Sequence, residues 1–283
     1  MNVTPPSPPF AVVGLGQLGG GLVRALGRAF PEAQVKAVDT DAKARSQALR
    51  DRLVAQAEEA PGPWLADCGL VFLCVPLAAL PGILPQLAPH LAPHAIVTDV
   101  SPVKGAIAAL VAEHLPGARY VGGHPLVAGD PAGAGPARSD LFVGRPVALC
   151  PRPGEESLAA SVGTVWAAIG ARPVVISADE HDRLIAATAH VPYLTALALA
   201  RVAGALDGAE RLIARAFGEA LRPAGLSPEA MAAAVGANPF APAAARVLAD
   251  ELRRLAELAE KEPESLVGVA IEGRTALGRL LSD

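Results

Sequence analysis

The sequence predicts an α/β protein in which a doubly wound parallel sheet is followed by an all-α C-terminal domain. Three observations lead to this prediction. From Phe10 onward, short apolar runs alternate with stretches of helical periodicity. Most of these runs end in Gly, Asp or Pro, which is typical of buried parallel strands. After Ile176 the strand signals stop, and the rest of the chain shows helical patterns only.

The apolar runs are expected to form the strands of the sheet. In order they are FAVVGLG, QVKAVDT, CGLVFLCVP, HAIVTDV, ARYVGG, RPVALCP and ARPVVIS. Ser177 and Glu180 form a capping box, which predicts a long helix from there to about Ala205. We therefore expect a disordered tail at residues 1–9, a sheet domain at residues 10–176 and a helical domain at residues 177–283.

The composition limits the class of partner. The 283 residues carry a net charge of -4, and the lysines lie singly at 36, 43, 104 and 261, so no basic patch for nucleic acid is expected. Three cysteines without CxxC spacing predict neither a disulfide framework nor a zinc site, and they suit a reducing cytoplasm. Arg201 interrupts the longest apolar stretch, so no membrane partner is expected, and residues 2–9 do not resemble a signal peptide.

A glycine-rich segment after the first apolar run predicts a dinucleotide site. The segment is Gly14-Leu15-Gly16-Gln17-Leu18-Gly19, a GxGxxG that opens a helix. Asp39 ends the next strand, twenty residues after Gly19. In such a unit the pyrophosphate lies at the helix N-terminus and the acid binds the ribose hydroxyls. Because Asp39 would repel a 2′-phosphate, the sequence favours NAD over NADP in a Rossmann-like domain.

Two further segments are expected at the nicotinamide end of that site. They are Cys74-Val75-Pro76 and Thr98-Asp99-Val100-Ser101, each at the carboxyl end of a predicted strand. Ligands of doubly wound sheets bind at that edge. Val75, Pro76 and Asp99 are therefore predicted to line the cofactor site.

The segment YVGGHPLVAGDPAG, residues 120–133, is predicted to be a shaped loop that carries chemistry. Two glycines free the backbone before His124, and Pro125 stiffens it afterwards. Read alone, His124 is either a functional group or a loop histidine that caps a backbone group.

Several motifs in this order resemble the prephenate and arogenate dehydrogenases of tyrosine biosynthesis. They are GLGQLGGGL, LCVP, TDVSPVK, GGHPLVAGDPAG with DLFVGRP, and DEHDRLIAATAHVPYLTALAL, together with a fainter match at residues 217–238 that ends in Asn238. The resemblance implies an NAD-dependent oxidative decarboxylation of prephenate to 4-hydroxyphenylpyruvate. It also implies a homodimer, and the apolar helices after residue 177 favour one formed through the helical domain.

The resemblance implies roles for His124 and Arg222, and a proline in the long helix makes His190 a third candidate. His124 matches the histidine that hydrogen-bonds the substrate hydroxyl, and a neutral imidazole suits the uptake of that proton. His190 lies two residues before Pro192, whose missing N–H costs a regular helix about 3 kcal/mol, so it is either a site residue or a core histidine beside a bend. Arg222 matches an arginine that pairs with a substrate carboxylate, although it could be solvated like Arg211 or Arg215.

The sequence departs from the family on the substrate side. Pro102 stands where the family usually has a serine, so Ser101 is the available hydroxyl for that catalytic role. Tyr193 replaces the second histidine of HLPH, and Gly218 replaces a basic residue. Glu219 replaces an aspartate, and Asp130 falls where a glutamate is common. Tyr193, Glu219 and Asp130 therefore join Arg222 as candidate substrate-binding residues.

Three alternatives remain at the level of the sequence. Arogenate could replace prephenate as substrate. A β-hydroxyacid dehydrogenase shares the architecture but generally uses a lysine on the long interdomain helix, and no lysine lies between residues 105 and 260. A catalytically silent NAD-binding module is the third, favoured by Pro102 and Tyr193.

Overall fold

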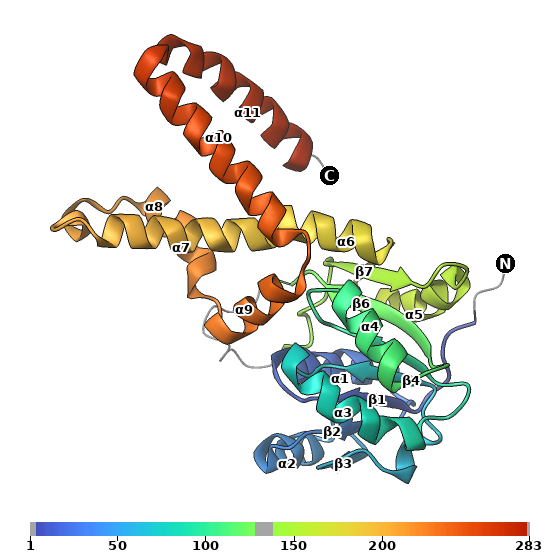
Figure 1. Ribbon diagram of the computed structural model, residues 1–283. Coiled ribbons are helices and arrows are strands. Elements are labelled where there is room, and N and C mark those ends of the chain that lie inside the picture. Colours follow the sequence, from blue (N-terminus) through green and yellow to red (C-terminus); the bar gives the residue numbers. More distant parts are fainter. Residues whose placement is uncertain (1–3, 128–137, 282–283) are drawn as a thin grey trace.

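The computed structural model describes residues 4–127 and 138–281 and contains a sheet domain followed by a helical part (Figure 1). The sheet has eight strands: β1 (Phe10–Val13), β2 (Val35–Val38), β3 (Gln56–Glu58), β4 (Leu70–Leu73), β5 (Ile96–Asp99), β6 (Arg119–Pro125), β7 (Pro146–Pro151) and β8 (Arg172–Val175). The predicted fold class, a doubly wound sheet followed by helices, is confirmed.

The strand order is β3-β2-β1-β4-β5-β6-β7-β8. All seven predicted runs contain strands, whereas β3 escaped prediction because Gln56-Ala57-Glu58 is short, polar and only partly buried. The expectation of uniformly parallel strands is wrong at one place. β6 pairs with β7 antiparallel, with His124 opposite Ala148, and the other neighbouring strands are parallel.

Helices cover both faces of the sheet. The helices of this domain are α1 (Gln17–Ala29), α2 (Ala42–Arg50), α3 (Leu80–Leu87), α4 (Gly105–His114) and α5 (Glu156–Ala168). One buried cluster joins α1 and α5 to the sheet through Leu22, Leu26 and Trp166. A second joins α3 and α4 to the opposite face through Leu84, Ile107 and Val111. The strand ends therefore emerge from a rigid, three-layered core.

The helical part begins with a nearly continuous rod. α6 (Ala178–Ile185) leads through a π-helical turn, η4 (Ala186–His190), into α7 (Val191–Gly204). Ser177 Oγ accepts a hydrogen bond from the Glu180 N–H, as the capping box predicts. The π turn ends where Val191 N–H donates to Ala186, one residue further back than in an α-helix. The chain thereby accommodates Pro192, which sequence reasoning associated with a bend.

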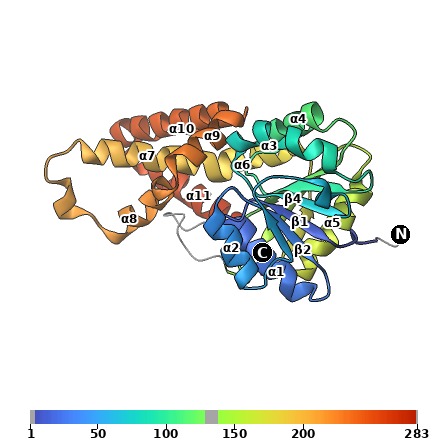
Figure 2. The same cartoon turned by 90° about the horizontal axis from the view of Figure 1, so that it is seen from below.

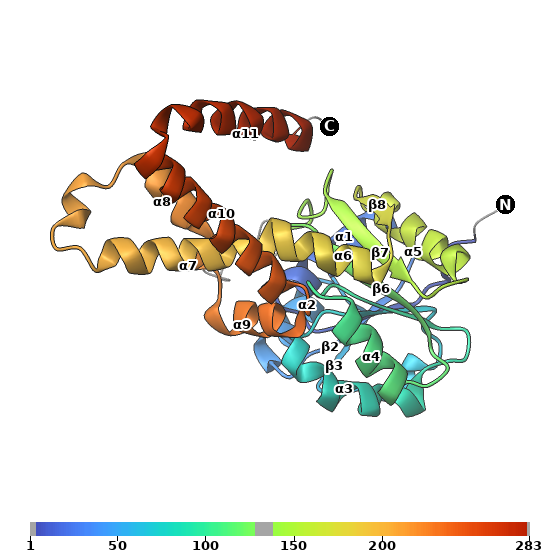
Figure 3. The same ribbon diagram turned by 45° about the horizontal axis from the view of Figure 1, so that its top comes forward.

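Of the remaining helices, α9 lies beside the sheet domain, whereas α10 leads away from it (Figures 2 and 3). They are α8 (Arg215–Leu221), α9 (Pro228–Ala237), α10 (Ala241–Lys261) and α11 (Leu266–Leu281). Short 3-10 turns are η1 (Pro63–Leu65), η2 (Leu77–Ala79), η3 (Ala88–His90), η5 (Ala209–Leu212), η6 (Arg222–Gly225) and η7 (Pro263–Ser265). By length and composition, the rod Ala178–Gly204 is the one helix among the described residues that could cross a membrane. A helix that lines a protein core meets the same criteria, so this is weak evidence for a span.

The expected disordered tail is partly corrected by the structure. Of residues 4–9, Pro6 is buried, and Pro9 accepts a hydrogen bond from the Gly69 N–H. A Cβ on Gly69 would lie 2.1 Å from the Ser7 carbonyl oxygen, so this segment packs tightly at the start of β4. The Pro-rich composition of this segment predicted disorder, because it gives no sign of the packing partner at Gly69.

Candidate active site

A first cavity of about 480 Å³ lies at the carboxyl ends of β1, β2 and β4. Its volume is within the range of ligand pockets. The predicted cofactor residues Gly14, Gly16, Asp39, Val75 and Pro76 all line it. The structure therefore brings together segments that lie far apart in the sequence.

The glycine segment is shaped by close backbone packing. Gly14 has φ of +98°, and a Cβ there would lie 2.6 Å from the Cys74 carbonyl oxygen. A Cβ on Gly19 would meet the Gly14 carbonyl oxygen, so α1 can approach β1 only with glycine at this position. Gly16, the N-cap of α1, faces open space. An anion can therefore approach the helix N-terminus, which the dipole favours.

The other residues of the segment support this arrangement. Leu15 and Leu18 pack against the core, and Gln17 is the first residue of α1. Asp39 follows β2, where its Oδ2 accepts from the Leu15 N–H at 2.5 Å and its Oδ1 accepts from the Asp41 N–H at 2.7 Å. Its carboxylate thus lies beside the glycine loop.

A second cavity, of about 470 Å³, is lined by two of the three predicted catalytic residues and by the predicted carboxylate-binding arginine. His124 comes from β6, His190 from η4 and Arg222 from η6. The other lining residues are apolar apart from Thr188: Pro102, Val127, Ile185, Ala189, Pro192, Pro223, Leu226, Met231 and Ala234. Two imidazoles and one guanidinium thus face a mostly apolar chamber.

The prediction that His124 lies in a shaped loop is wrong, because the residue belongs to β6. The preceding glycines serve strand packing: a Cβ on Gly123 would lie 2.3 Å from the Asp99 carbonyl oxygen. β7 pairs along β6 as far as Pro125, so the imidazole stands on a rigid strand. A GGHP sequence is indistinguishable from a turn until its antiparallel partner is known.

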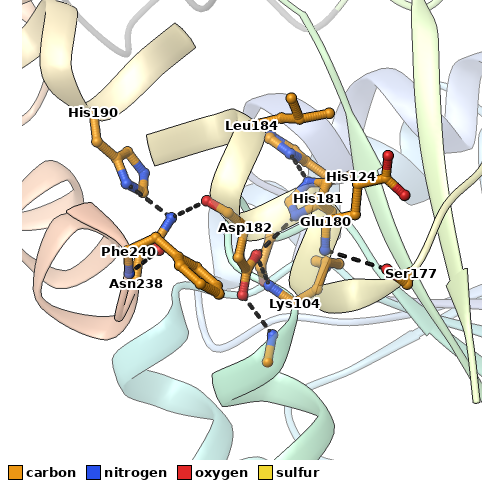
Figure 4. Close-up of polar contacts among 12 residues, drawn as sticks. Lys104, His124, Ser177, Glu180, His181, Asp182, Leu184, His190, Asn238 and Phe240 are labelled. Carbon is orange, nitrogen blue, oxygen red and sulfur yellow. Dashed lines mark hydrogen bonds and ion pairs between the residues drawn. The ribbon is translucent and has the colours of Figure 1, made fainter. Parts of the chain in front are cut away.

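His124 is half-buried and begins a chain of polar contacts that continues through the buried His181 and Asp182 (Figure 4). Its Nδ1 lies 2.9 Å from His181 Nε2, and His181 Nδ1 lies 2.8 Å from Asp182 Oδ1. Burial lowers the pKa of His124 well below its usual value, and the positive charge of Lys104 lowers it further. His124 is therefore neutral near pH 7. Sequence reasoning missed His181 and Asp182, whose only signal was the DEHD of the matched helix.

His190 is held by a different partner. Asn238 Nδ2 lies 3.2 Å from His190 Nδ1 and donates at 2.8 Å to the Asp182 carbonyl (Figure 4). Asn238 Oδ1 accepts from the Phe240 N–H, which fixes the orientation of the amide. Since Asn238 donates to His190 Nδ1, a neutral His190 carries its proton on Nε2. Burial lowers the pKa of His190, with a smaller contribution from His181 and an opposing one from Asp182.

Asp99 and Ser101 are placed differently from their predicted roles. The Asp99 carboxylate is fully buried and accepts from Lys104 Nζ, Tyr120 OH, and the Ser101 and Gly123 N–H groups. It therefore holds the strand backbone next to His124 in place, and its buried oxygens are not available to a cofactor. Ser101 is buried, and Pro102 occupies the cavity wall in its place. In the sequence, Asp99 looks like a cofactor-binding residue because it ends a strand at the ligand-binding edge of the sheet. Its buried ion pair with Lys104 is not evident from the sequence.

Three substrate-side candidates remain apart from Arg222. Tyr193 is buried in α7 and is not among the described residues that line the cavity. Glu219 is exposed and pairs with Arg215 at 2.9 Å, one turn away on α8. Asp130 lies outside the described residues. Of the four predicted substrate-binding residues, Arg222 alone is seen at the cavity.

The fold and the glycine loop define a dinucleotide-binding protein of the doubly wound class. Residues 22–175 match the family described as prephenate dehydrogenase, nucleotide-binding domain. A 4-amino-4-deoxyprephenate dehydrogenase of Streptomyces pristinaespiralis is 33% identical over 243 residues, which cover 80% of this chain and 78% of that protein. The chain belongs to the prephenate dehydrogenase family and is an oxidoreductase.

Two other proteins place the chain among its relatives. The cyclohexadienyl dehydrogenase of Zymomonas mobilis is 29% identical over 194 residues, or 67% of this chain, and the match spans 65% of that protein's length. A crystal structure of prephenate dehydrogenase from A. aeolicus, in complex with hydroxyphenyl propionate and NAD+, superposes with a TM-score of 0.85. It covers 96% of this chain and 98% of its own, and at 21% identity it shows the shared fold.

Proposed function

We propose that this protein catalyses the NAD-dependent oxidative decarboxylation of prephenate to 4-hydroxyphenylpyruvate. The observation that carries the proposal is the meeting of His124, His190 and Arg222 in one cavity of about 470 Å³. The cavity offers a proton acceptor and a carboxylate-binding cation within apolar walls. A substrate with a ring hydroxyl and two carboxylates requires such a combination.

The first cavity fits NAD. The open N-terminus of α1 at Gly16 accommodates a pyrophosphate, and Asp39 is placed to accept from ribose hydroxyls. Glu59 lines this cavity together with Asp39, and the two carboxylates would disfavour a 2′-phosphate there, although Arg45 lies 3.6 Å from Glu59. When bound, NAD supplies the acceptor for the hydride.

His124 handles the proton of the reaction. As the ring C–H bond at the carbinol carbon gives up its hydride, the hydroxyl O–H bond breaks and its proton passes to the imidazole. Loss of carbon dioxide then returns a pair of electrons to the ring, which becomes aromatic. The phenol oxygen takes the proton back, so the histidine ends the cycle neutral. A group that starts unprotonated near pH 7 suits this sequence, as the lowered pKa of His124 allows.

Arg222 and His190 hold the substrate. A guanidinium binds a carboxylate through two parallel hydrogen bonds, and Arg222 is the cation among the described residues of the cavity wall. The Nε2–H of neutral His190 is a second donor for a carboxylate or keto oxygen. The described residues of that wall include no Asp or Glu to pair with the ammonium of arogenate, which favours the keto acid.

A second candidate substrate is 4-amino-4-deoxyprephenate. The relative from Streptomyces pristinaespiralis, named for that substrate, shares 33% identity over most of both chains. Pro102 supplies no hydroxyl at the place where the family's serine meets the ring substituent. The uncharged His124 lone pair can accept from an amine as well as from a hydroxyl.

Steady-state rates with prephenate, arogenate and 4-amino-4-deoxyprephenate test this order. We expect the largest kcat/KM with prephenate and NAD. A kcat/KM at least tenfold larger for the amino compound would establish the second candidate. A larger value for arogenate would overturn the argument from the cavity wall. Absence of turnover with all three would identify a catalytically silent member of the family.

We also propose that residues 177–283 form a substrate and dimerisation domain beside an NAD-binding domain at residues 10–176. The groove between α7 and α10 is almost wholly apolar, lined by residues such as Leu194, Leu199 and Leu248. Large apolar side chains remain exposed on this part: Val202, Leu206, Leu212, Ile213, Val247, Leu252, Val267, Ile271, Leu277, Leu280 and Leu281. A second copy of the chain would cover such a surface. The free cysteines Cys68, Cys74 and Cys150 suit a cytoplasmic location.

A further inference from the structure

The His181–Asp182 pair is buried, yet neither residue lines the cavity among the described residues. Both residues lie in the middle of α6, and Asp182 is also bound to the start of α4. Its Oδ1 accepts from the Lys104 N–H and its Oδ2 from the Gly105 N–H, each at 2.8 Å. A carboxylate at a helix N-terminus is stabilised by the dipole. The pair therefore has a fixed position relative to the sheet domain.

The charge of Asp182 is compensated without a cationic histidine. Burial opposes ionisation, but hydrogen bonds from His181, Lys104 and Gly105 outweigh it and keep the pKa of Asp182 below its usual value. The nearby cation, Lys104 Nζ, is already paired with Asp99. Two of the three hydrogen bonds that the carboxylate accepts come from backbone N–H groups, so Asp182 does not depend on a cationic partner, and the proposal below takes His181 as a neutral imidazole.

The hydrogen-bond directions then follow in one sense only. An ionised Asp182 can only accept, so His181 Nδ1 carries a proton and donates to it. His181 Nε2 is consequently an acceptor, and the 2.9 Å contact requires His124 Nδ1 to donate. His124 is then neutral with its lone pair on Nε2. Because Nδ1 of His124 is occupied by His181, Nε2 is the ring nitrogen that remains available to a molecule in the cavity.

We propose that the His181–Asp182 pair is a positioning device that holds His124 in the tautomer with the proton on Nδ1. This leaves Nε2 to receive the substrate's proton, and the inference rests on the proposed role of His124 as proton acceptor. When Nε2 takes the proton, Nδ1 still donates to His181, and the Asp182 carboxylate stabilises the resulting charge one ring away. Neither His181 nor Asp182 is among the described residues that line either cavity, so the pair acts through His124.

Asp182 also determines the tautomer of His190, which is opposite to that of His124. The Asp182 carbonyl orients Asn238, which donates to His190 Nδ1 and leaves the proton of His190 on Nε2. The cavity therefore presents one imidazole that accepts and one that donates. A substrate hydroxyl that must lose a proton and a carboxylate that must receive a hydrogen bond are distinguished by these two rings.

The direct test is the side-chain ¹⁵N NMR spectrum of the protein labelled at histidine, recorded near pH 7.5. We expect His124 and His181 to be neutral with Nδ1 protonated, and His190 to be neutral with Nε2 protonated. His124→Gln, His181→Gln and His190→Gln assign the signals. A His124 protonated on Nε2, or a cationic His181 at this pH, would overturn the proposal. This measurement needs no turnover, so it stands even if the proposed function fails.

Kinetics provide the second test. His181→Phe keeps a buried ring but removes the acceptor, so we expect kcat to fall by about tenfold or more, but by less than the roughly 10²–10⁴-fold loss expected for His124→Ala. KM should change little. In His181→Gln, the amide oxygen can accept from His124 Nδ1 and should restore most of the rate. His94→Phe, on the exposed surface, is the matched control.

The pH profile separates positioning from simple support of the fold. His124 is faced by Lys104 with its partner Asp99, by His181 with Asp182, and by His190, while Arg222 lines the same cavity. In His181→Phe the acid limb of kcat/KM should shift, whereas in His181→Gln it should stay near the wild-type position. Equal rates and pH profiles in the wild type and His181→Phe would refute the positioning role. If Phe and Gln lose activity to the same extent with unshifted profiles, the role of His181 is only structural.

Discussion

Asn238 donates to both His190 Nδ1 and the main-chain carbonyl of Asp182, and so joins the end of α9 to the π turn and to α6. We expect Asn238→Ala to raise KM about tenfold, because His190 loses the partner that keeps its Nε2–H directed at the substrate. Steady-state kinetics with thermal melting as a control test this. Unchanged kinetic constants in a folded variant would show that Asn238 serves only the packing of α9.

Arg222→Ala should chiefly raise KM, because a carboxylate is gripped equally in the ground and transition states. The loss corresponds to a charged hydrogen bond, about 1.5–3 kcal/mol or roughly 10- to 150-fold. Arg215→Ala is the matched control, since Arg215 pairs only with Glu219 among the described contacts and its side chain is 92% exposed. If both variants behave like the wild type, a different group binds the carboxylate.

Asp39→Ser should weaken NAD binding and narrow the preference for NAD over NADP. The change removes a ribose acceptor and a charge that repels a 2′-phosphate. Asp41→Ser keeps a good N-cap for α2 and serves as the control. Michaelis constants for NAD and NADP provide the measurement, and unchanged values for both would show that Asp39 serves only to order the glycine loop.

Lys104→Met should destabilise the fold by about 3–5 kcal/mol, because it leaves the Asp99 carboxylate buried without its cation. Lys43→Met, at an exposed position of α2, should cost little. Urea unfolding followed by circular dichroism measures the difference. Equal unfolding midpoints for the two variants would show that the buried Lys104–Asp99 ion pair does not stabilise the fold.

Sedimentation equilibrium should show a dimer at micromolar concentration, because association would bury the exposed apolar side chains of α7, α10 and α11. Paired changes in the groove, Leu199→Glu with Leu252→Glu, should yield monomer, whereas Leu49→Glu on α2 should not. A stable wild-type monomer at that concentration would refute the proposed dimer.

Features of the fold that depend on local sequence patterns could be predicted from the sequence. Runs such as FAVV and LVFL show a buried strand by their composition, and the spacing from Gly14 to Asp39 indicates the dinucleotide unit. What escaped prediction depends on partners distant in sequence. β3 and the strand conformation of His124 are set by pairing, and the burial of Asp99 is set by Lys104.

The second layer of the site was beyond local patterns for the same reason. His181 meets His124 across fifty-seven residues, and Asn238 meets His190 across forty-eight. Nothing in DEHD or in GANPF indicates which nitrogen of which histidine will be bonded. The resemblance to a family pointed to His124 and Arg222, and the proline after His190 pointed to that residue. The hydrogen-bond directions could be assigned only from the folded chain.

The most direct test of the proposed function is a stoichiometric assay with prephenate and NAD. The appearance of reduced nicotinamide and of 4-hydroxyphenylpyruvate would be measured in wild-type protein and in His124→Ala. We predict equal amounts of both products from the wild type, and a kcat lower by about 10²–10⁴-fold in the variant with unchanged NAD affinity. Reduced nicotinamide formed at the same rate by His124→Ala, or no product from the wild type, would contradict the account.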